Sequence, residues 1–182
     1  PFDVWEGAVT LAFAAKEFPP GTVFVAIVDP GVGTGRKAIA LQTEAGRFYV
    51  APDNGLLTLV ARREGIADVR DISQFQPLGH APSRTFQGRD LFAPAGALLA
   101  AGVPLGRMGT RLKEIVMLPV TDPALDGGRV KGSVLHVDHY GNVVTNIPAD
   151  LLSKLGLKRG DKLDARVGDA SVQATYAATY GD

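Results

Sequence analysis

Hydrophobic and polar residues recur at helical spacing in the first part of the chain and then change to a strand-like run. Asp3 and Glu6 form a typical capping pair, and apolar residues follow every three or four positions until Phe18. The apolar face of this segment consists of Val4, Ala8, Leu11, Ala12 and Ala15. Six consecutive apolar residues, 23–28, then stop at the turn-forming segment 29–31. This pattern predicts a helix followed by a buried strand that ends in a turn.

The next patterns are shorter and complete an α/β arrangement. Residues 37–41 and 47–50 predict two strands, and residues 56–63 predict a helix capped by Asp53 and Asn54. Because strands and helices alternate along this part of the chain, we expect an N-terminal α/β domain with a central sheet.

The middle of the chain is expected to hold a long loop and a packing helix. Residues 68–84 contain prolines and a glycine, and predict irregular structure of the kind that often forms functional loops. Residues 91–101 are rich in alanine and leucine, and predict a helix capped by Asp90 with Pro94 near its first turn.

A change of pattern near residue 120 divides the chain. Residues 119–128 contain two prolines, two glycines and two aspartates, and predict a linker between an α/β domain, residues 1–118, and a smaller domain, residues 129–182. Short alternating segments predict that the smaller domain is a β-barrel or sandwich, incomplete at its C-terminus, with one helix, 149–155, ended by Gly156. Its predicted strands are residues 129–137, 143–147, 163–167 and 171–176.

Composition and charge exclude several classes of function. The 182 residues include 19 basic and 19 acidic side chains, so no net charge favours nucleic acid or an anionic membrane surface as the main partner. No cysteine is present to form a disulfide or a thiolate metal site, and no apolar run is long enough to cross a bilayer. We expect a cytoplasmic protein. Because the sequence opens on Pro1 rather than methionine, we expect an internal segment of a longer protein.

The first group of candidate functional residues lies around the loop DPGVGTGR. A carboxylate, Asp29, ends the predicted strand, and a guanidinium, Arg36, follows seven residues later across three glycines. The two charges can meet in a crevice at the strand end, where α/β folds place ligands. The alternative is a glycine-rich turn with a surface ion pair. The Walker phosphate-binding pattern does not fit, because Arg36 stands where that motif requires glycine.

Two further groups can form walls of a binding site. Residues 85–90, TFQGRD, offer backbone amides at a helix start and a glycine that allows close approach; the alternative is an elaborate helix cap. Residues 138–146, DHYGNVVTN, suit a flat heterocycle, because Tyr140 can stack on a ring and Asn142 can recognise its polar edge. The alternative for this segment is a tight turn.

The three histidines are His80, His136 and His139, and they show no spacing typical of metal ligands. No cluster of carboxylates or cysteines completes a site around any of them. We therefore predict no metal centre.

Four segments together resemble the S-adenosylmethionine hydroxide adenosyltransferases, relatives of the S-adenosylmethionine-dependent fluorinase and chlorinase. They read VDPGVGTGR, APDNGLLT, TFQGRDLFAP and DHYGNVVTNI, and the resemblance extends over nearly the whole chain. It implies an N-terminal α/β domain, a C-terminal β domain, and homotrimers whose active sites lie between neighbouring subunits. It also implies hydrolysis of S-adenosylmethionine to adenosine and L-methionine, without a metal or other cofactor.

The resemblance assigns catalytic roles to three positions. Asp29 and Arg36 match the aspartate and arginine that position a water molecule against the ribose C5′ atom. Hydrolases of the family usually read TFHGRD, so the position of their histidine is Gln87 here. Glutamine can hydrogen-bond the water but cannot take its proton near neutral pH. Two hypotheses stay open: a hydrolase, and a non-catalytic member that binds S-adenosylmethionine or adenosine without turnover.

A halogenase is the less favoured alternative. The resemblance to the fluorinase is incomplete at three positions of its halide pocket. The fluorinase has tyrosine, threonine and serine where this chain has Asp29, Val32 and Gly88. A fixed carboxylate at residue 29 would repel a halide ion.

Seven positions match substrate contacts in the family. They are Phe2, Thr85, Phe86, Asp138, Tyr140, Asn142 and Tyr180. The first three match positions along the ribose and the nucleophile pocket. Tyr140, Asn142 and Tyr180 match positions around the adenine, and Asp138 matches one near the methionine amino group. The family's first strand and a serine-arginine segment that binds the methionine carboxylate are expected before and after the residues given.

Overall fold

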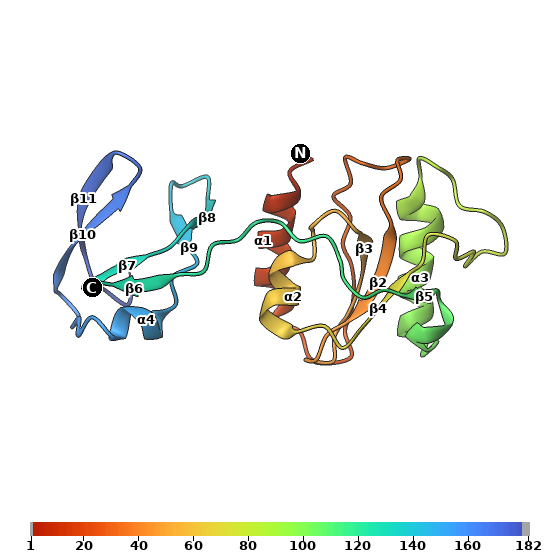
Figure 1. Cartoon of the computed structure of the whole chain (residues 1–182), viewed down its shortest axis with the longest axis horizontal. Coiled ribbons are helices and arrows are strands. Elements are labelled where there is room, and N and C mark those ends of the chain that lie inside the picture. Colours follow the sequence, from red (N-terminus) through yellow and green to blue (C-terminus); the bar gives the residue numbers. More distant parts are fainter. Residues whose placement is uncertain (1, 180–182) are drawn as a thin grey trace. The chain divides into compact units, whose positions relative to one another are not determined.

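The computed structural model describes residues 2–179 and divides into two compact units, residues 1–119 and 120–182 (Figure 1). The boundary falls at the start of the expected linker. In the described part of the chain no helix is both long and apolar enough to cross a membrane.

The first unit is built on a five-stranded mixed sheet with strand order β1-β3-β2-β4-β5. Its strands are β1 Val23–Val25, β2 Ala38–Gln42, β3 Phe48–Pro52, β4 Asp68–Asp71 and β5 Thr110–Arg111. β1 runs parallel to β3, and the other pairs are antiparallel. The α/β class predicted for this part of the chain is therefore confirmed.

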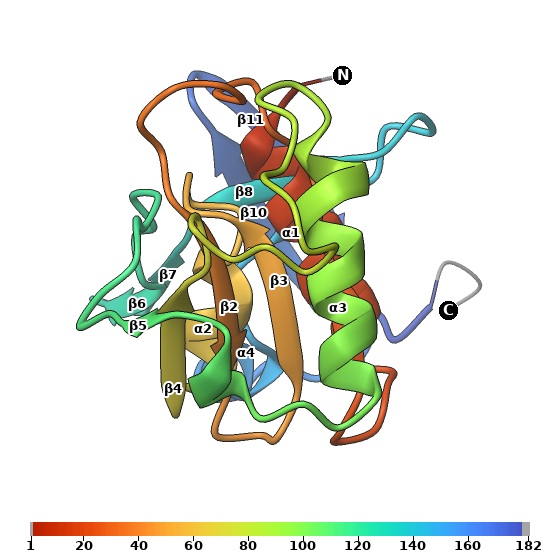
Figure 2. The same ribbon diagram turned by 90° about the vertical axis from the view of Figure 1, so that its right-hand side faces the viewer.

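Helices cover both faces of this sheet (Figure 1). Helices α1 (Val4–Ala15) and α2 (Thr58–Glu64) pack on one face, and α3 (Ala93–Ala100) packs on the other, in front of the strands in Figure 2. Strand β2 serves both cores because alternate residues face opposite sides: Ile39 packs under α1 and α2, and Ala40 packs under α3.

The start of the chain folds as the hydrophobic pattern predicts. The Asp3 side chain accepts a hydrogen bond of 3.1 Å from the Glu6 backbone N–H and so caps α1. The next strand is shorter than expected, because the ladder to β3 ends with a bond from Ala26 N to Val50 O, 3.0 Å long. It is also less buried than expected, since β1 is an edge of the described sheet and leaves the side chain of Ile27 44% exposed beyond it.

Three local expectations for the next segments are wrong. Leu57, and neither Asp53 nor Asn54, occupies the N-cap of α2. Residues 68–71 are not irregular, because they form β4 and pair with β2. Asp90 does not cap α3: it lies inside a π-helix, Gly88–Phe92, that leads directly into that helix. Pro94 does lie in the first turn of α3, as predicted.

The buried Glu64, at the C-terminal end of α2, contacts Thr43 just after β2 and Tyr49 in β3. The Glu64 side chain is 4% exposed and accepts hydrogen bonds from Thr43 Oγ1, Tyr49 Oη and Arg63 Nη2, with Arg47 Nη1 at 3.5 Å. Burial alone would raise the pKa of Glu64, but the hydrogen bonds from Arg63, Thr43 and Tyr49 outweigh it and lower that pKa. Burial and the neighbouring carboxylate raise the pKa of Tyr49, which keeps its hydroxyl a donor.

We expect Glu64→Gln to destabilise the protein by about 3 kcal/mol, because two arginines lose their buried partner. Glu114→Gln, at an exposed glutamate, is the matched control and should not change the midpoint of urea unfolding. A depressed carboxyl pKa stabilises the folded state above the ordinary value of 4.5 and loses that contribution as the pH falls below it. The difference between wild type and Glu64→Gln should therefore shrink below that pH; a constant difference would contradict this assignment.

The second unit contains three two-stranded antiparallel sheets and one short helix, α4 Ala149–Ser153. The strands are β6 Ala124–Asp126 with β7 Arg129–Lys131, β8 Val134–Val137 with β9 Val143–Thr145, and β10 Lys162–Val167 with β11 Ala170–Thr175. These sheets do not close into a barrel among residues 120–179, and none of the residues described there is buried.

Two details of this unit differ from the pattern-based prediction. Residues 124–126, expected in a linker, form β6. The single strand expected over residues 129–137 is interrupted at Gly132, where an added Cβ would lie 2.4 Å from the Ile147 side chain. A side chain at this position would therefore collide with the chain that follows β9.

Candidate functional site

The loop DPGVGTGR carries Asp29 away from the sheet and returns Arg36 to the start of β2. Successive turns close it, with bonds from Val32 N to Asp29 O of 3.3 Å and from Thr34 N to Gly31 O of 3.2 Å. The Thr34 hydroxyl also donates to Gly31 O at 2.6 Å and accepts from Arg36 N at 3.4 Å. These contacts bring two residues seven positions apart to the same place.

Asp29 and Arg36 form a two-pronged ion pair inside the unit. Arg36 Nε donates to Asp29 Oδ1 at 3.0 Å, and Arg36 Nη2 donates to Asp29 Oδ2. The two side chains are 6% and 11% exposed, respectively, so the alternative of a surface ion pair is wrong. The ring of Phe92 lies 5.3 Å from the guanidinium carbon and supports it from the side of the core.

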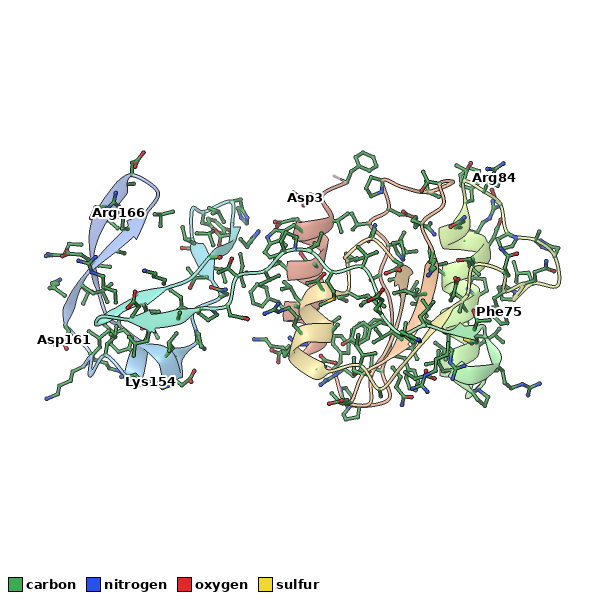
Figure 3. All side chains as sticks on the ribbon, in the orientation of Figure 1. Asp3, Phe75, Arg84, Lys154, Asp161 and Arg166 are labelled. Carbon is green, nitrogen blue, oxygen red and sulfur yellow. The ribbon has the colours of Figure 1, made fainter. Side chains whose placement is uncertain are left out.

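Gln87 completes this cluster from a different part of the chain. The loop after β4, on which Phe75 and Arg84 are labelled in Figure 3, ends at Gln87 just before the π-helix. Arg36 Nη2 donates to Gln87 Oε1 at 2.6 Å. Because a guanidinium can only donate, this bond turns the amide oxygen toward Arg36 and leaves the amide NH₂ as the group that can meet a ligand.

A cavity of about 380 Å³ lies beside Asp29. Its lining residues are Phe2, Ile27, Val28, Asp29, Val32, Thr85 and Gly88. The volume lies within the range of small-molecule sites. Phe2 and Thr85 therefore border the same space as Asp29, whereas Phe86 is not among the lining residues and has its ring 5.1 Å from the Arg89 guanidinium carbon.

Asp90 fixes the segment that delivers Gln87. It accepts hydrogen bonds from Arg89 Nε at 2.6 Å and from Ser83 N at 3.0 Å. These bonds, chiefly the one from Arg89, lower the pKa of Asp90 to about 2. Its charge is therefore kept at neutral pH, and it ties the end of the loop to the π-helix.

The candidate residues of the second unit form the turn between β8 and β9. Asp138 Oδ1 accepts from Tyr140 N and Asn142 N, both at 2.9 Å, and Asp138 Oδ2 accepts from Asn142 Nδ2 at 2.7 Å. The bond from the Asn142 side chain is the main reason that the pKa of Asp138 is lowered. The segment therefore forms a tight turn, and the 80% exposed Tyr140 ring remains available to a ligand. Tyr180 lies outside the described residues.

The sequence patterns do not predict two residues that support the site. Phe92, interpreted as part of a packing helix, supports the Arg36 guanidinium, and Asn54, interpreted as a helix cap, donates to Val28 O at 2.8 Å. The motif APDNGLLT contained Asn54, but nothing in its spacing predicts a partner 26 residues earlier. Among residues 2–179, no group of three or more His, Asp or Glu side chains can hold a metal ion.

Comparison with known proteins gives consistent matches along the chain. Residues 1–109 match the model of the SAM hydroxide adenosyltransferase N-terminal domain, and residues 132–182 match that of the C-terminal domain. A crystal structure of an uncharacterized conserved protein from Thermotoga maritima has a TM-score of 0.93 and 44% identity, covering 100% of this chain and 69% of that one.

Two curated relatives carry names that describe activities. The (R)-S-adenosyl-L-methionine hydrolase of Methanocaldococcus jannaschii is 39% identical over 150 residues, 82% of this chain and 51% of that protein. The fluorinase of Nocardia brasiliensis is 35% identical over 189 residues, 90% of this chain and 63% of that protein. The chain thus spans 51% and 63% of the lengths of these two relatives. It belongs to the S-adenosylmethionine (SAM) hydroxide adenosyltransferase family.

Proposed function

We propose that the protein hydrolyses S-adenosylmethionine to adenosine and L-methionine. The observation that carries this proposal is the buried Asp29–Arg36 pair, bonded to Gln87, with Asp29 lining a cavity of about 380 Å³. The hydrolase from Methanocaldococcus jannaschii supports the same reaction class.

The chemistry requires little more than a positioned water molecule. A lone pair of the water oxygen forms a bond to C5′ of the ribose, the C5′–S bond breaks, and its electron pair returns to sulfur to give the thioether of methionine. The attacking oxygen loses one proton, which passes to the Asp29 carboxylate and on to solvent, and this leaves the 5′-hydroxyl group of adenosine. Because a sulfonium is a good leaving group, the protein has mainly to hold the water in line and free of bulk solvent. The Asp29 carboxylate accepts a hydrogen bond from this water, and the two hydrogen bonds from Arg36 fix the carboxylate in place.

Gln87 would hold the same water by donating a hydrogen bond to it from the side-chain NH₂ group. Its amide oxygen is occupied by Arg36, so its NH₂ group faces the water oxygen. One lone pair of the water is then engaged by the amide and one is left for C5′. This arrangement orients the nucleophile but offers no base beyond Asp29.

The substrate contacts are part of the proposal. Phe2 and Thr85 border the cavity and suit the ribose. The exposed Tyr140 ring suits the adenine, with Asn142 beside it, whereas Asp138 must serve the methionine amino group while it holds its own turn. A trimer with sites between subunits and a cytoplasmic location complete this proposal.

Two other functions can be separated from hydrolysis by experiment. Gln87 cannot take a proton near neutral pH, and this favours binding of S-adenosylmethionine without turnover. A halogenase is suggested by the fluorinase relative, but the buried carboxylate of Asp29 disfavours a halide in the cavity.

Full-length protein incubated with S-adenosylmethionine should release adenosine and methionine in equal amounts, measured by chromatography. The incubation should be repeated with fluoride or chloride, and S-adenosylmethionine binding should be measured by calorimetry. Binding without adenosine would replace the hydrolase proposal with the binding function. A halogenated deoxyadenosine would replace it with halogenase activity.

A further inference from the structure

Among the described residues, the backbone that presents Asp29 pairs with no strand at the point where Asp29 leaves the sheet. The last ladder bond between β1 and β3 is made by Ala26 N, and residues 27–29 extend beyond it. The position of the Asp29 carboxylate therefore depends on its pair with Arg36 and on what holds the residue before it.

Two contacts from distant elements hold Val28. The Asn54 side chain donates from Nδ2 to Val28 O at 2.8 Å and accepts from Leu56 N at 3.2 Å, so one amide joins the strand end to the start of α2. The Val28 side chain fits against α1 at Gly7, where an added Cβ would lie 2.8 Å from Val28 Cγ2. One contact fixes the carbonyl and the other fixes the side chain.

The turn that carries Asn54 is itself anchored. Asp53 Oδ1 accepts from Val116 N at 2.8 Å, and Thr58 Oγ1 donates to Gly55 O at 2.7 Å. Asn54 is thus held on a braced turn and can act as a fixed donor.

We propose that Asn54 and Gly7 are positioning residues for the reaction: together they clamp Val28 and thereby set the place of the Asp29 carboxylate next to the cavity. This inference rests on the proposed hydrolysis for its kinetic consequence, but the clamp itself concerns only the Asp29–Arg36 geometry. Neither residue touches the reacting atoms in this assignment.

The test uses an isosteric change. Asn54→Asp keeps an oxygen for Leu56 N–H and replaces the donor to Val28 O with an oxygen that repels it. We expect kcat to fall about 10- to 100-fold with little change in KM, because a displaced catalytic group costs rate rather than binding. Asp53→Asn, in the same turn, keeps the acceptor for Val116 N–H and should leave kcat unchanged.

A second readout does not need turnover. The Nε–H signal of Arg36 in ¹⁵N NMR reports its 3.0 Å bond to Asp29, and its hydrogen exchange should accelerate in Asn54→Asp but not in Asp53→Asn. If the wild type does not hydrolyse S-adenosylmethionine, the proposed function fails while this exchange rate still decides the clamp.

Gly7→Ala is the independent second variant, because it displaces Val28 from the other side. The same loss of kcat and the same faster exchange are expected. Unchanged exchange in both variants would overturn the proposal. Loss of kcat only in proportion to a fall in thermal stability, or failure of both variants to fold, would also overturn it and leave a purely structural role.

Discussion

Replacing Asp29 by asparagine is expected to lower kcat for adenosine formation by about 10³-fold, since a positioned carboxylate that accepts from the nucleophile typically contributes this much. Asparagine keeps the shape of the side chain but removes the charge that meets both Arg36 contacts. The guanidinium then lacks its anionic partner, and the water lacks the acceptor that orients its proton. Initial rates at saturating S-adenosylmethionine give the measurement.

A matched control is available in the same sheet. Asp68 accepts two hydrogen bonds from Arg70, at 2.9 and 2.8 Å, on strand β4. Asp68→Asn therefore also breaks a paired aspartate and arginine, but away from the cavity, and kcat should not change. Equal losses in both variants would show that Asp29 acts through folding rather than through the water.

Gln87→His is expected to raise kcat about 10- to 100-fold, because a general base near neutral pH typically accelerates proton transfer by such factors. The present amide gives its oxygen to Arg36 and can only donate to the water. An imidazole has a nitrogen that can accept the proton when the ring is neutral. The rate of the variant should therefore rise with pH through the histidine pKa, about 6.5, whereas the wild type should lack this step.

Gln87→Ala provides the comparison for this prediction. It removes the bond to Arg36 without adding a base, so kcat should fall below that of the wild type. If Gln87→His were as slow as Gln87→Ala, or slower than the wild type, the glutamine would not be a defect and the site would be adapted to it.

The sequence predicts contacts between residues that are close along the chain better than contacts between distant segments. The Asp3 cap and the first helix follow from residues three or four positions apart, and both are confirmed. The Asp29–Arg36 pair is predicted because the two residues lie seven positions apart across a glycine-rich loop. These features depend on local geometry alone.

Contacts between distant segments were not predictable in the same way. Asn54 looks like a helix cap by composition, and only the fold shows its donor directed at the end of β1. Phe92 lies at the end of a π-helix, 5.3 Å from the Arg36 guanidinium carbon, and a hydrophobic pattern does not predict such a helix. The sequence does not predict β4, because Asp68, Arg70 and Asp71 are polar and the segment lacks the run of apolar residues typical of a buried strand.

In the second unit the strands are predicted from the sequence, but the way they pack is not. Its segment 138–146 has two interpretations, a ligand-binding wall and a tight turn. The hydrogen bonds that Asp138 accepts from Tyr140 N and Asn142 N show the turn, and the binding role stays a prediction. The β character predicted for this unit is confirmed by its three two-stranded sheets, although none of its described residues is buried. Short alternating strands predict pairing, but they do not fix how pairs of strands close on one another.

In the proposed reaction, water positioned by Asp29, which Arg36 holds in place, attacks C5′ of S-adenosylmethionine. The most direct measurement is mass spectrometry of the adenosine formed in H₂¹⁸O. Attack by this water places one ¹⁸O atom in the 5′-hydroxyl group and no label in methionine. Adenosine without the label, or labelled adenosine formed at the same rate by Asp29→Asn, would contradict it.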